Sequence, residues 1–364
     1  MKSKIPKITL ELALAHCYDA TEKKASESIT QFAFKDKELT LKCKGAFTFF
    51  EETISNIELD EDCTFSLKTS LLLEFVKHIT SDSIFVVFDN QKKTCLISGS
   101  DKKSKLALQS VDCVISDSSD DEYDISFNVT YLDFINKLTY ASRFCALNFE
   151  SYPLTAIHCH IKDTKLQIQS TNGMGFYQTS VDKELTEELE IYIPKKSPIV
   201  IKNIFGDGHF EKISVNKNNV MFKSDRCKLK IFLEKCEFGL FPEQIVSWLD
   251  EQSVATIDVS SYELSNTIKL FNSLFNECSV CLKVGDDKLE VFSEENGLAV
   301  KETVVVENCT GESNSFYNSK SIIDCIESIQ SSWIKMDFIP RQNEYNLCKF
   351  IAGGNIILLC PTIS

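Results

Sequence analysis

The chain has 364 residues and carries 39 basic and 53 acidic side chains, which gives a formal net charge of −14. This acidic surplus argues against a protein that coats nucleic acid with its whole surface, because phosphates would repel it. No run of about 18 apolar residues is present, and the basic first residues lack the apolar segment of a secretory signal. We therefore expect a cytoplasmic protein without a membrane-spanning helix.

The first third of the chain predicts two helices and two hairpins. Apolar residues recur at helical spacing over residues 8–20 and 69–80. Residues 32–43 alternate polar and apolar side chains around a tight polar turn, and residues 84–108 form a second hairpin pattern. This order predicts an α+β domain with helices on one face of a mostly antiparallel sheet.

The same order of elements occurs twice more. The second third has its counterparts at residues 130–143, 157–173, 197–205 and 213–233, and the last third at residues 260–275, 282–292, 319–330 and 333–360. Aligning the first hairpin of each copy puts Leu39, Leu166 and Leu289 at one position, at intervals of about 125 residues. Ser197, followed by Pro198, is a typical capping residue at a helix start.

Three copies of one domain follow from these repeats, with expected bounds of 1–122, 123–250 and 251–364. An acidic run at residues 117–122 falls at the first boundary and is interpreted as a solvated linker. Residues 250–253 have the same place at the second boundary.

The 15 cysteines are odd in number and scattered, which indicates reduced, mostly buried thiols. Cys278 and Cys281 form a CxxC pair, but a zinc site needs a second pair and this one leads into a strand pattern. In His158-Cys159-His160, alternation places the two histidines on one sheet face and the cysteine on the other, as ordinary sheet residues. We therefore expect neither a metal site nor a cofactor.

Basic side chains recur on the predicted helices or at their ends. Taken singly, each is typical of a solvated helix face, but their repetition favours a basic surface if the six helices lie on one side. These basic residues include Lys77, Lys137, Arg143, Lys195, Lys196 and Lys202, with Lys23 and Lys24 in the turn after the first helix.

Four short segments, taken in order, resemble the beta sliding clamp of bacterial DNA polymerase III. Thr171-Asn-Gly-Met-Gly-Phe176 is similar to that family's T-D-G-H-R-L, and Ile193-Pro-Lys-Lys196 to its V-P-R-K. Phe238-Gly-Leu-Phe-Pro-Glu243 is similar to G-R-F-P-D, and the last residues, 358–364, to V-V-M-P-M-R-L. The resemblance spans nearly the whole chain.

The resemblance implies a head-to-tail homodimeric ring that encircles double-stranded DNA without sequence preference. It makes the eight basic residues named above the candidates for DNA contact. Such a ring holds a replicative polymerase, a clamp loader and other clamp-motif proteins through an apolar peptide pocket. The matching pocket positions are Leu154, Thr171, Gly173, Met174, Phe176, Pro242, Val246, Leu358, Cys360, Pro361 and Thr362. Ring closure is expected to bring Leu106 and Leu108 against Leu274 and Phe275 of the partner, although all four could instead belong to their own domain cores.

The pocket departs from the family pattern at Met174, which replaces a histidine, at Val246, which replaces an arginine, and at the terminal residues, where an arginine is lost. We therefore expect a more apolar pocket, dominated by two or three anchor side chains of the peptide.

Two other classes of protein, an enzyme and a scaffold, stand beside this interpretation. The chain has no G-x-S-x-G, P-loop or H-E-x-x-H motif, so an enzyme has little support; a scaffold of repeated domains that does not bind DNA remains an alternative.

Overall fold

The computed structural model describes most of the chain. The described residues are 1–21, 28–101, 103–117, 122–147, 154–162, 164–182, 188–206, 208, 210, 212–235, 243–295, 297–341 and 345–362. They group into two compact units, one made of Met1–Ile135 with Lys196–Glu234 and the other of Asn136–Lys195 with Lys235–Ser364.

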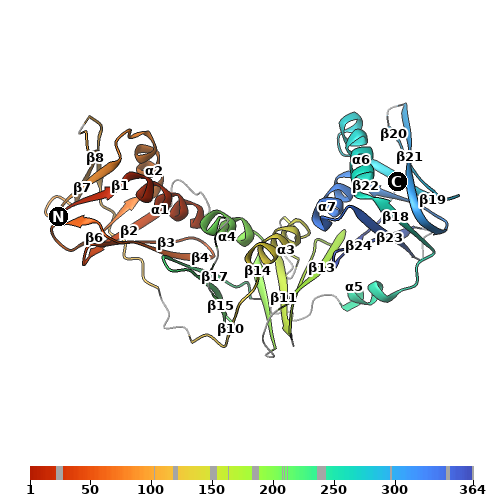
Figure 1. The fold of residues 1–364 in the computed structure, drawn as a ribbon, viewed down its shortest axis with the longest axis horizontal. Coiled ribbons are helices and arrows are strands. Elements are labelled where there is room, and N and C mark those ends of the chain that lie inside the picture. Colours follow the sequence, from red (N-terminus) through yellow and green to blue (C-terminus); the bar gives the residue numbers. More distant parts are fainter. Residues whose placement is uncertain are drawn as a thin grey trace. The chain divides into compact units, whose positions relative to one another are not determined.

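The first unit contains two antiparallel sheets (Figure 1). The smaller has the order β5-β1-β7-β8-β9, with bounds Glu58–Leu59, Lys2–Pro6, Ser83–Asp89, Thr94–Gly99 and Lys105–Gln109. The larger has the order β10-β15-β16-β17-β4-β3-β2-β6, with bounds Ile125–Phe127, Lys212–Val215, Asn219–Lys223, Cys227–Phe232, Thr48–Ile54, Glu38–Lys44, Ile29–Lys35 and Cys63–Lys68.

The second unit contains one twelve-stranded sheet among its described residues. Its first six strands, in spatial order, are β14 (Leu189–Pro194), β11 (Ala156–Lys162), β12 (Lys165–Thr171), β13 (Gly175–Asp182), β25 (Asn355–Leu359) and β24 (Asn346–Ala352). The other six are β23 (Trp333–Pro340), β18 (Ala255–Ser260), β21 (Leu298–Gly311), β20 (Lys288–Glu295), β19 (Ser279–Gly285) and β22 (Ser313–Asn318).

The six predicted helices are all present within a residue or two of their expected bounds. They are α1 (Lys7–Ala20), α2 (Thr69–His78), α3 (Tyr131–Arg143), α4 (Ser197–Phe205), α6 (Ser261–Phe275) and α7 (Ser319–Ile329). A short helix that the sequence did not predict, α5 (Glu243–Ser247), leads into the 3-10 turn η1 (Trp248–Asp250). In Figure 1, α1 packs beside α2 and α6 beside α7, so each pair covers part of a sheet.

The three repeated hairpins have the same register, which confirms the alignment of their leucines. Leu39 pairs with Phe34, Leu166 with Ile161, and Leu289 with Val284, five residues earlier in each case. All three leucines are buried. In the first and third copies the turn has two successive residues with positive φ, as two-residue hairpin turns require.

Strands from successive repeats join edge to edge, and we call these joints the first and second seams. At the first seam, β17 pairs with β4, so that Leu229 lies opposite Phe50. At the second seam, β25 pairs with β13, so that Leu358 lies opposite Phe176. In both, the last strand of one repeat extends the sheet of the repeat before it. Because the sheets cross the expected repeat boundaries, the compact units do not coincide with single repeats.

The sequence predicts the proline in the first turn of α4 correctly, but its prediction of the capping residue is wrong. Pro198 occupies the first turn of α4 as predicted, but Ser197 is the first helical residue and not its cap. Lys196 holds the cap position, without a side-chain hydrogen bond. The side chains of Ser260 and Asn318 cap α6 and α7 instead, each accepting a backbone N–H three residues later.

The described cysteines are free thiols, and most are buried, as the sequence predicts. Cys159 lies in the core, whereas His158 and His160 project from the other face of β11 toward Glu190 and Glu188. No described helix has both the length and the apolar character needed to cross a bilayer.

Asp117, at the start of the acidic run, is not the solvated residue that the sequence suggests. Its carboxylate accepts hydrogen bonds from the ammonium groups of Lys228 and Lys230 on β17, at 2.5 and 2.7 Å. Burial acts to raise the pKa of Asp117, but the two ammonium groups outweigh it and hold this pKa below its ordinary value. Residues 118–121 of the run lie outside the described residues.

Replacing Asp117 by asparagine should lower the free energy of unfolding by about 2 kcal/mol at pH 7, because charge-assisted hydrogen bonds are lost. Since the folded-state pKa is depressed, this contribution is fully present above the unfolded pKa of about 3.9 and disappears as the pH falls through the folded value. Denaturant titrations at several pH values measure both effects. The exposed neighbour Asp112, replaced in the same way, is the matched control; an equal loss at neutral and acidic pH would contradict the role of charge.

Candidate functional site

A hydrophobic cluster at the second seam is the strongest candidate site. Its buried members come from four neighbouring strands: Phe176 of β13, Leu358 of β25, Leu347 of β24 and Ile339 of β23. Ile245, Trp248 and Leu249, all from α5 and η1, pack against it together with Cys360. The short helix thus lies over the sheet and leaves its apolar side chains only partly buried, as in a binding surface for an apolar ligand.

The turn between β12 and β13 presents Met174 beside this cluster. The side-chain oxygen of Asn172 accepts hydrogen bonds from the backbone N–H groups of Met174 and Gly175, at 2.9 and 2.8 Å. Gly173 has φ of 85°, which favours glycine, and a side chain at Gly175 would press on the ring of Phe144. The turn is therefore fixed while the Met174 side chain remains 52% exposed.

The chain end and the turn are joined directly. The backbone N–H of Cys360 donates to the carbonyl oxygen of Met174 at 2.8 Å. Burial raises the pKa of the Cys360 thiol, against the opposing effect of the nearby Arg341 guanidinium. The thiol is therefore protonated at neutral pH and contributes to the surface as a small apolar group.

Arg341 holds Trp248 in place over the cluster. The guanidinium carbon lies 4.5 Å from the centroid of the indole ring, and Nη1 donates to a carboxylate oxygen of Glu251 at 2.6 Å. A cation over an indole face is favourable, and the ion pair fixes the angle of the guanidinium. Trp248 and Arg341 were not predicted from the sequence, although Ile245, Trp248 and Leu249 have helical spacing.

The structure brings together most of the predicted pocket residues. Thr171, Gly173, Met174, Phe176, Leu358 and Cys360 lie at or beside the cluster. Val246 is not among the residues packed against it and is 36% exposed. Thr362 is held elsewhere, because its N–H donates to the Phe316 carbonyl and its hydroxyl contacts that of Ser279.

Two further pocket residues flank this arrangement. The carbonyl oxygen of Leu154 accepts from the N–H of Ala146, which places Leu154 near the end of α3. Pro361 is half-buried between Cys360 and Thr362. Pro242 lies outside the described residues.

The predicted DNA-contacting cations differ in how much they are engaged within the chain. Lys195 donates to the carbonyl oxygens of Cys145 and Ala146, at 2.6 and 3.5 Å, just beyond α3. Lys137 donates to the Ser180 carbonyl at 2.8 Å. These two ammonium groups help to fix the structure of the second unit, a role the sequence did not indicate.

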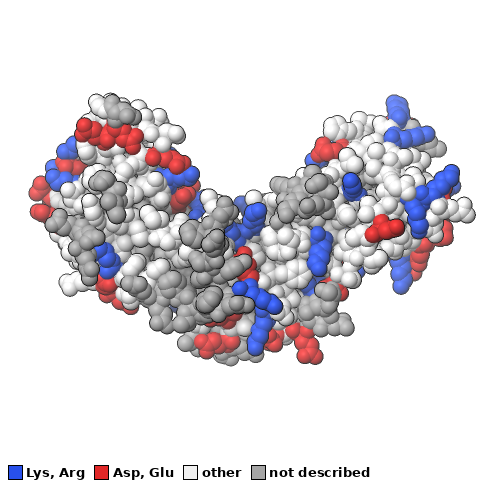
Figure 2. Space-filling view, turned by 180° about the vertical axis from the view of Figure 1, so that it is seen from behind, with Lys and Arg blue, Asp and Glu red and all other residues white. Residues whose placement is uncertain are grey.

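The remaining cations are more exposed. Arg143 contacts Glu327 at 3.1 Å, and Lys77 contacts Glu74 at 3.0 Å, both as surface ion pairs. Lys196 and Lys202 are exposed at the start and in the last turn of α4. Lys23 and Lys24 lie outside the described residues. On the face drawn in Figure 2, basic and acidic side chains are interspersed.

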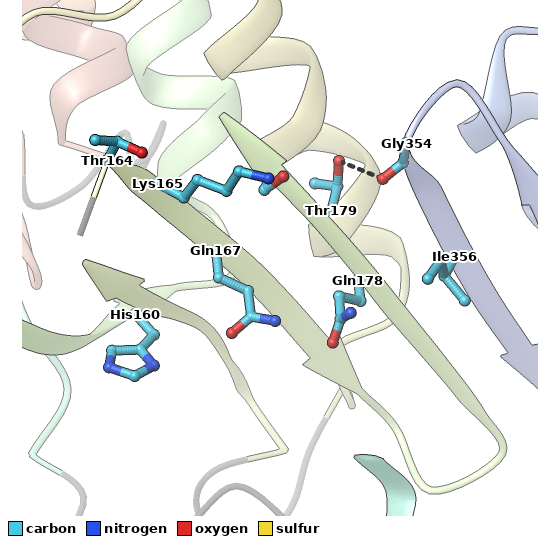
Figure 3. A pocket seen from close by; sticks show the side chains of 9 residues that line it. His160, Thr164, Lys165, Gln167, Gln178, Thr179, Gly354 and Ile356 are labelled. Atoms are coloured by element: carbon cyan, nitrogen blue, oxygen red, sulfur yellow. Dashed lines mark hydrogen bonds between the residues drawn. The ribbon is translucent and has the colours of Figure 1, made fainter. Parts of the chain in front are cut away.

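A hollow of about 540 Å³ lies over β11, β12, β13 and β25 (Figure 3). Its lining is mainly polar: the side chains of Gln167 and Gln178 lie next to each other, and the imidazole of His160 contacts Glu188 at 3.2 Å. None of the predicted site residues that the structure describes lines it. The hollow lacks the apolar anchor positions that the cluster offers.

Comparison with solved structures decides the fold. No family profile matches the sequence, and no curated protein matches it. The DNA polymerase sliding clamp from Bacillus subtilis matches with a TM-score of 0.87 at 16% identity, over 100% of this chain and 99% of the other. The chain has the fold of a bacterial sliding clamp. A putative DNA polymerase III beta subunit from Eubacterium rectale (16% identity) and the sliding clamp from Pseudomonas aeruginosa (13%) both give 0.88 over 100% of both chains.

The cluster lies where two repeats of the clamp fold meet. The second seam joins β13 to β25, so residues from two repeats meet on one continuous sheet. Identities of 13–16% establish the fold alone, so the roles of single residues rest on the contacts described above.

Structural and surface lysines of the clamp fold are separable by mutation. Lys195→Met should lower the free energy of unfolding by about 1.5 kcal/mol, because the ammonium group no longer donates to the carbonyls beyond α3. Lys196→Met removes an exposed neighbour and should change it by no more than about 0.5 kcal/mol. Urea unfolding of both variants compares the two, and equal stabilities would contradict the structural assignment of Lys195.

Proposed function

We propose that the chain is a DNA polymerase processivity factor, a ring-shaped clamp that encircles duplex DNA and tethers the replicative polymerase. The observation that carries the proposal is the full-length match to DNA polymerase sliding clamps at TM-scores of 0.87 and 0.88. We propose three clamp domains, at residues 1–122, 123–250 and 251–364, which act without catalysis in the cytoplasm. Because a closed ring holds DNA by topology, it needs only weak, sequence-independent phosphate contacts.

The seams within the chain support a head-to-tail dimer. Each seam joins the last strand of one repeat to the fourth strand of the repeat before it, as in β17 with β4 and β25 with β13. By the same rule, β9 should pair with β21, but the described residues leave β9 at a sheet edge. The Leu298–Val305 part of β21 has β20 on one side, while its pairing with β18 begins at Val306. We propose that β9 of one copy pairs with this part of β21 in a second copy.

Apolar side chains at these positions fit such an interface. Leu106 and Leu108 are half-exposed on the edge strand β9. Leu274 is 48% exposed and Phe275 is half-exposed at the end of α6. Contact of Leu106 and Leu108 of one copy with Leu274 and Phe275 of the other would bury all four side chains. An interface that closes after two copies gives a ring and not a filament.

We propose that exposed lysines of the helices contact the DNA backbone. Lys196 and Lys202 are the favoured contacts because their side chains are exposed. Lys77, Lys137, Arg143 and Lys195 remain candidates with partners inside the chain, and Lys23 and Lys24 remain candidates from the sequence. The overall acidic charge limits adhesion of the ring's other surfaces to DNA.

A topological test addresses encirclement. After loading, the protein should remain on nicked circular DNA and leave the same DNA once it is linearised. Association should weaken steeply with added salt and show no sequence preference. The double variant Lys196→Ala/Lys202→Ala should lessen the salt dependence, with the surface lysine pair Lys92→Ala/Lys93→Ala as its control. Sequence-specific or salt-insensitive binding, or equal retention on linear and circular DNA, would contradict the proposal.

We propose that the cluster at the second seam binds short peptide segments of the polymerase, the clamp loader and other clamp-motif proteins. Its apolar strands and the half-covered α5–η1 side chains suit a peptide with two or three apolar anchors. Met174 in place of histidine makes this surface more apolar than in the family pattern.

Truncating the surface should weaken peptide binding. Met174→Ala should lower the affinity for a labelled short peptide with leucine and phenylalanine anchors by about tenfold without changing stability, because Met174 is exposed. Leu358→Ala should also lower it, together with a stability loss of about 2–5 kcal/mol, because Leu358 is buried. Leu12→Ala, a similarly exposed residue on α1, is the control in fluorescence anisotropy titrations. Unchanged affinity in both pocket variants would remove this surface from the proposal.

A further inference from the structure

Three metal-ligating side chains converge at the first seam, in the first compact unit. They are His16 of α1, Glu52 of β4 and Cys227 of β17, and their ligand atoms all lie within 4.8 Å of one another. The Nδ1 atom of His16 is 2.9 Å from a carboxylate oxygen of Glu52. All three belong to the first compact unit, so their geometry is fixed within one body.

The seam itself creates this convergence. Cys227 and Glu52 are direct cross-strand partners in the β17–β4 ladder, so their side chains leave the sheet on the same face. Helix α1 packs on that face against β4 and brings His16 down onto the pair. The edge of the His16 ring rests against Phe50, with ring centroids 6.1 Å apart, which fixes the direction of the imidazole.

Burial makes the group chemically unusual. His16, Glu52 and Cys227 are 8, 7 and 9% exposed, respectively. A carboxylate withdrawn from water is costly unless its charge is compensated. A divalent cation held by a carboxylate and a thiolate leaves no net charge in the buried site. Without such an ion, the negative charge of Glu52 is balanced by the imidazole of His16 only when that ring is protonated.

We propose that His16, Glu52 and Cys227 bind one zinc ion. Zinc takes imidazole nitrogen, carboxylate oxygen and thiolate sulfur in tetrahedral sites, whereas Mg²⁺ and Ca²⁺ require oxygen ligands. Tetrahedral zinc bonds of about 2.1 Å place nitrogen and oxygen ligands about 3.4 Å apart, so the imidazole and the carboxylate separate by only about 0.5 Å on binding. A solvent molecule would complete the coordination.

The ion would cross-link α1, β4 and β17 and so fasten the first seam. The second seam has a different composition at its centre, the apolar pairs of β13 and β25 described above. Zinc would thus act as a structural ion at one joint between repeats, independently of DNA or peptide binding.

The test uses the full-length protein, stripped with a chelator and kept reduced. Co²⁺, a spectroscopic substitute for zinc, should give a thiolate-to-metal charge-transfer band that saturates at one ion per chain and is displaced by Zn²⁺. Zn²⁺ should also raise Tm. In Cys227→Ser the band should disappear, and Zn²⁺ affinity should fall by at least about 100-fold. Cys95→Ser, a buried thiol on β8 of the same unit, should behave like the unaltered chain.

A second variant tests the proposal in case Cys227→Ser does not fold. Glu52→Gln keeps the size and the hydrogen-bonding ability of the side chain, and should retain the fold while losing at least about tenfold in Zn²⁺ affinity. The proposal is overturned if the folded, unaltered chain shows no charge-transfer band, or if Cys227→Ser and Glu52→Gln bind as tightly as Cys95→Ser. None of these measurements (the Co²⁺ band, Tm and Zn²⁺ affinity) involves DNA, so failure of the zinc proposal is distinct from failure of the proposed clamp function.

Discussion

Backbone pairing between successive repeats is the interaction on which the rest of the structure depends. A single repeat has a sheet with an open edge on each side, and open edges are costly unless they are paired or covered. The chain solves this at β17–β4 and at β13–β25 by letting each repeat complete the sheet of the one before it. Both candidate sites follow from this arrangement, because each lies where strands from two repeats become neighbours.

Much of the fold could be predicted from the sequence because the relevant signals are local. Helical spacing marks α1 to α4, α6 and α7, and polar turns between alternating strands mark the hairpins. Repetition then fixes the alignment of Leu39, Leu166 and Leu289. Pairing across the repeats could not be predicted, because hydrogen bonds between backbones carry no side-chain signature. The predicted capping role of Ser197 is wrong because Ser197 is already the first helical residue, and Lys196 holds the cap position without a side-chain hydrogen bond.

The candidate surface was predictable only in part. Gly173, Met174 and Phe176 belong to a distinctive turn, and Leu358 ends the last strand, so these positions stand out. Trp248 and Arg341 lie far apart in sequence and interact only because α5 folds over the sheet. Charge was the least informative signal. A lysine looks the same in a sequence whether it faces solvent, as Lys196 does, or donates to backbone carbonyls, as Lys195 does.

The open edge of β9 has a consequence for the behaviour of the isolated chain. A strand with free backbone groups and two half-exposed leucines is a template for any extended segment that it meets. At high concentration, chains in which this strand stays unpaired would therefore be prone to aggregate through it. A purification should accordingly keep the protein dilute for as long as β9 is unpaired.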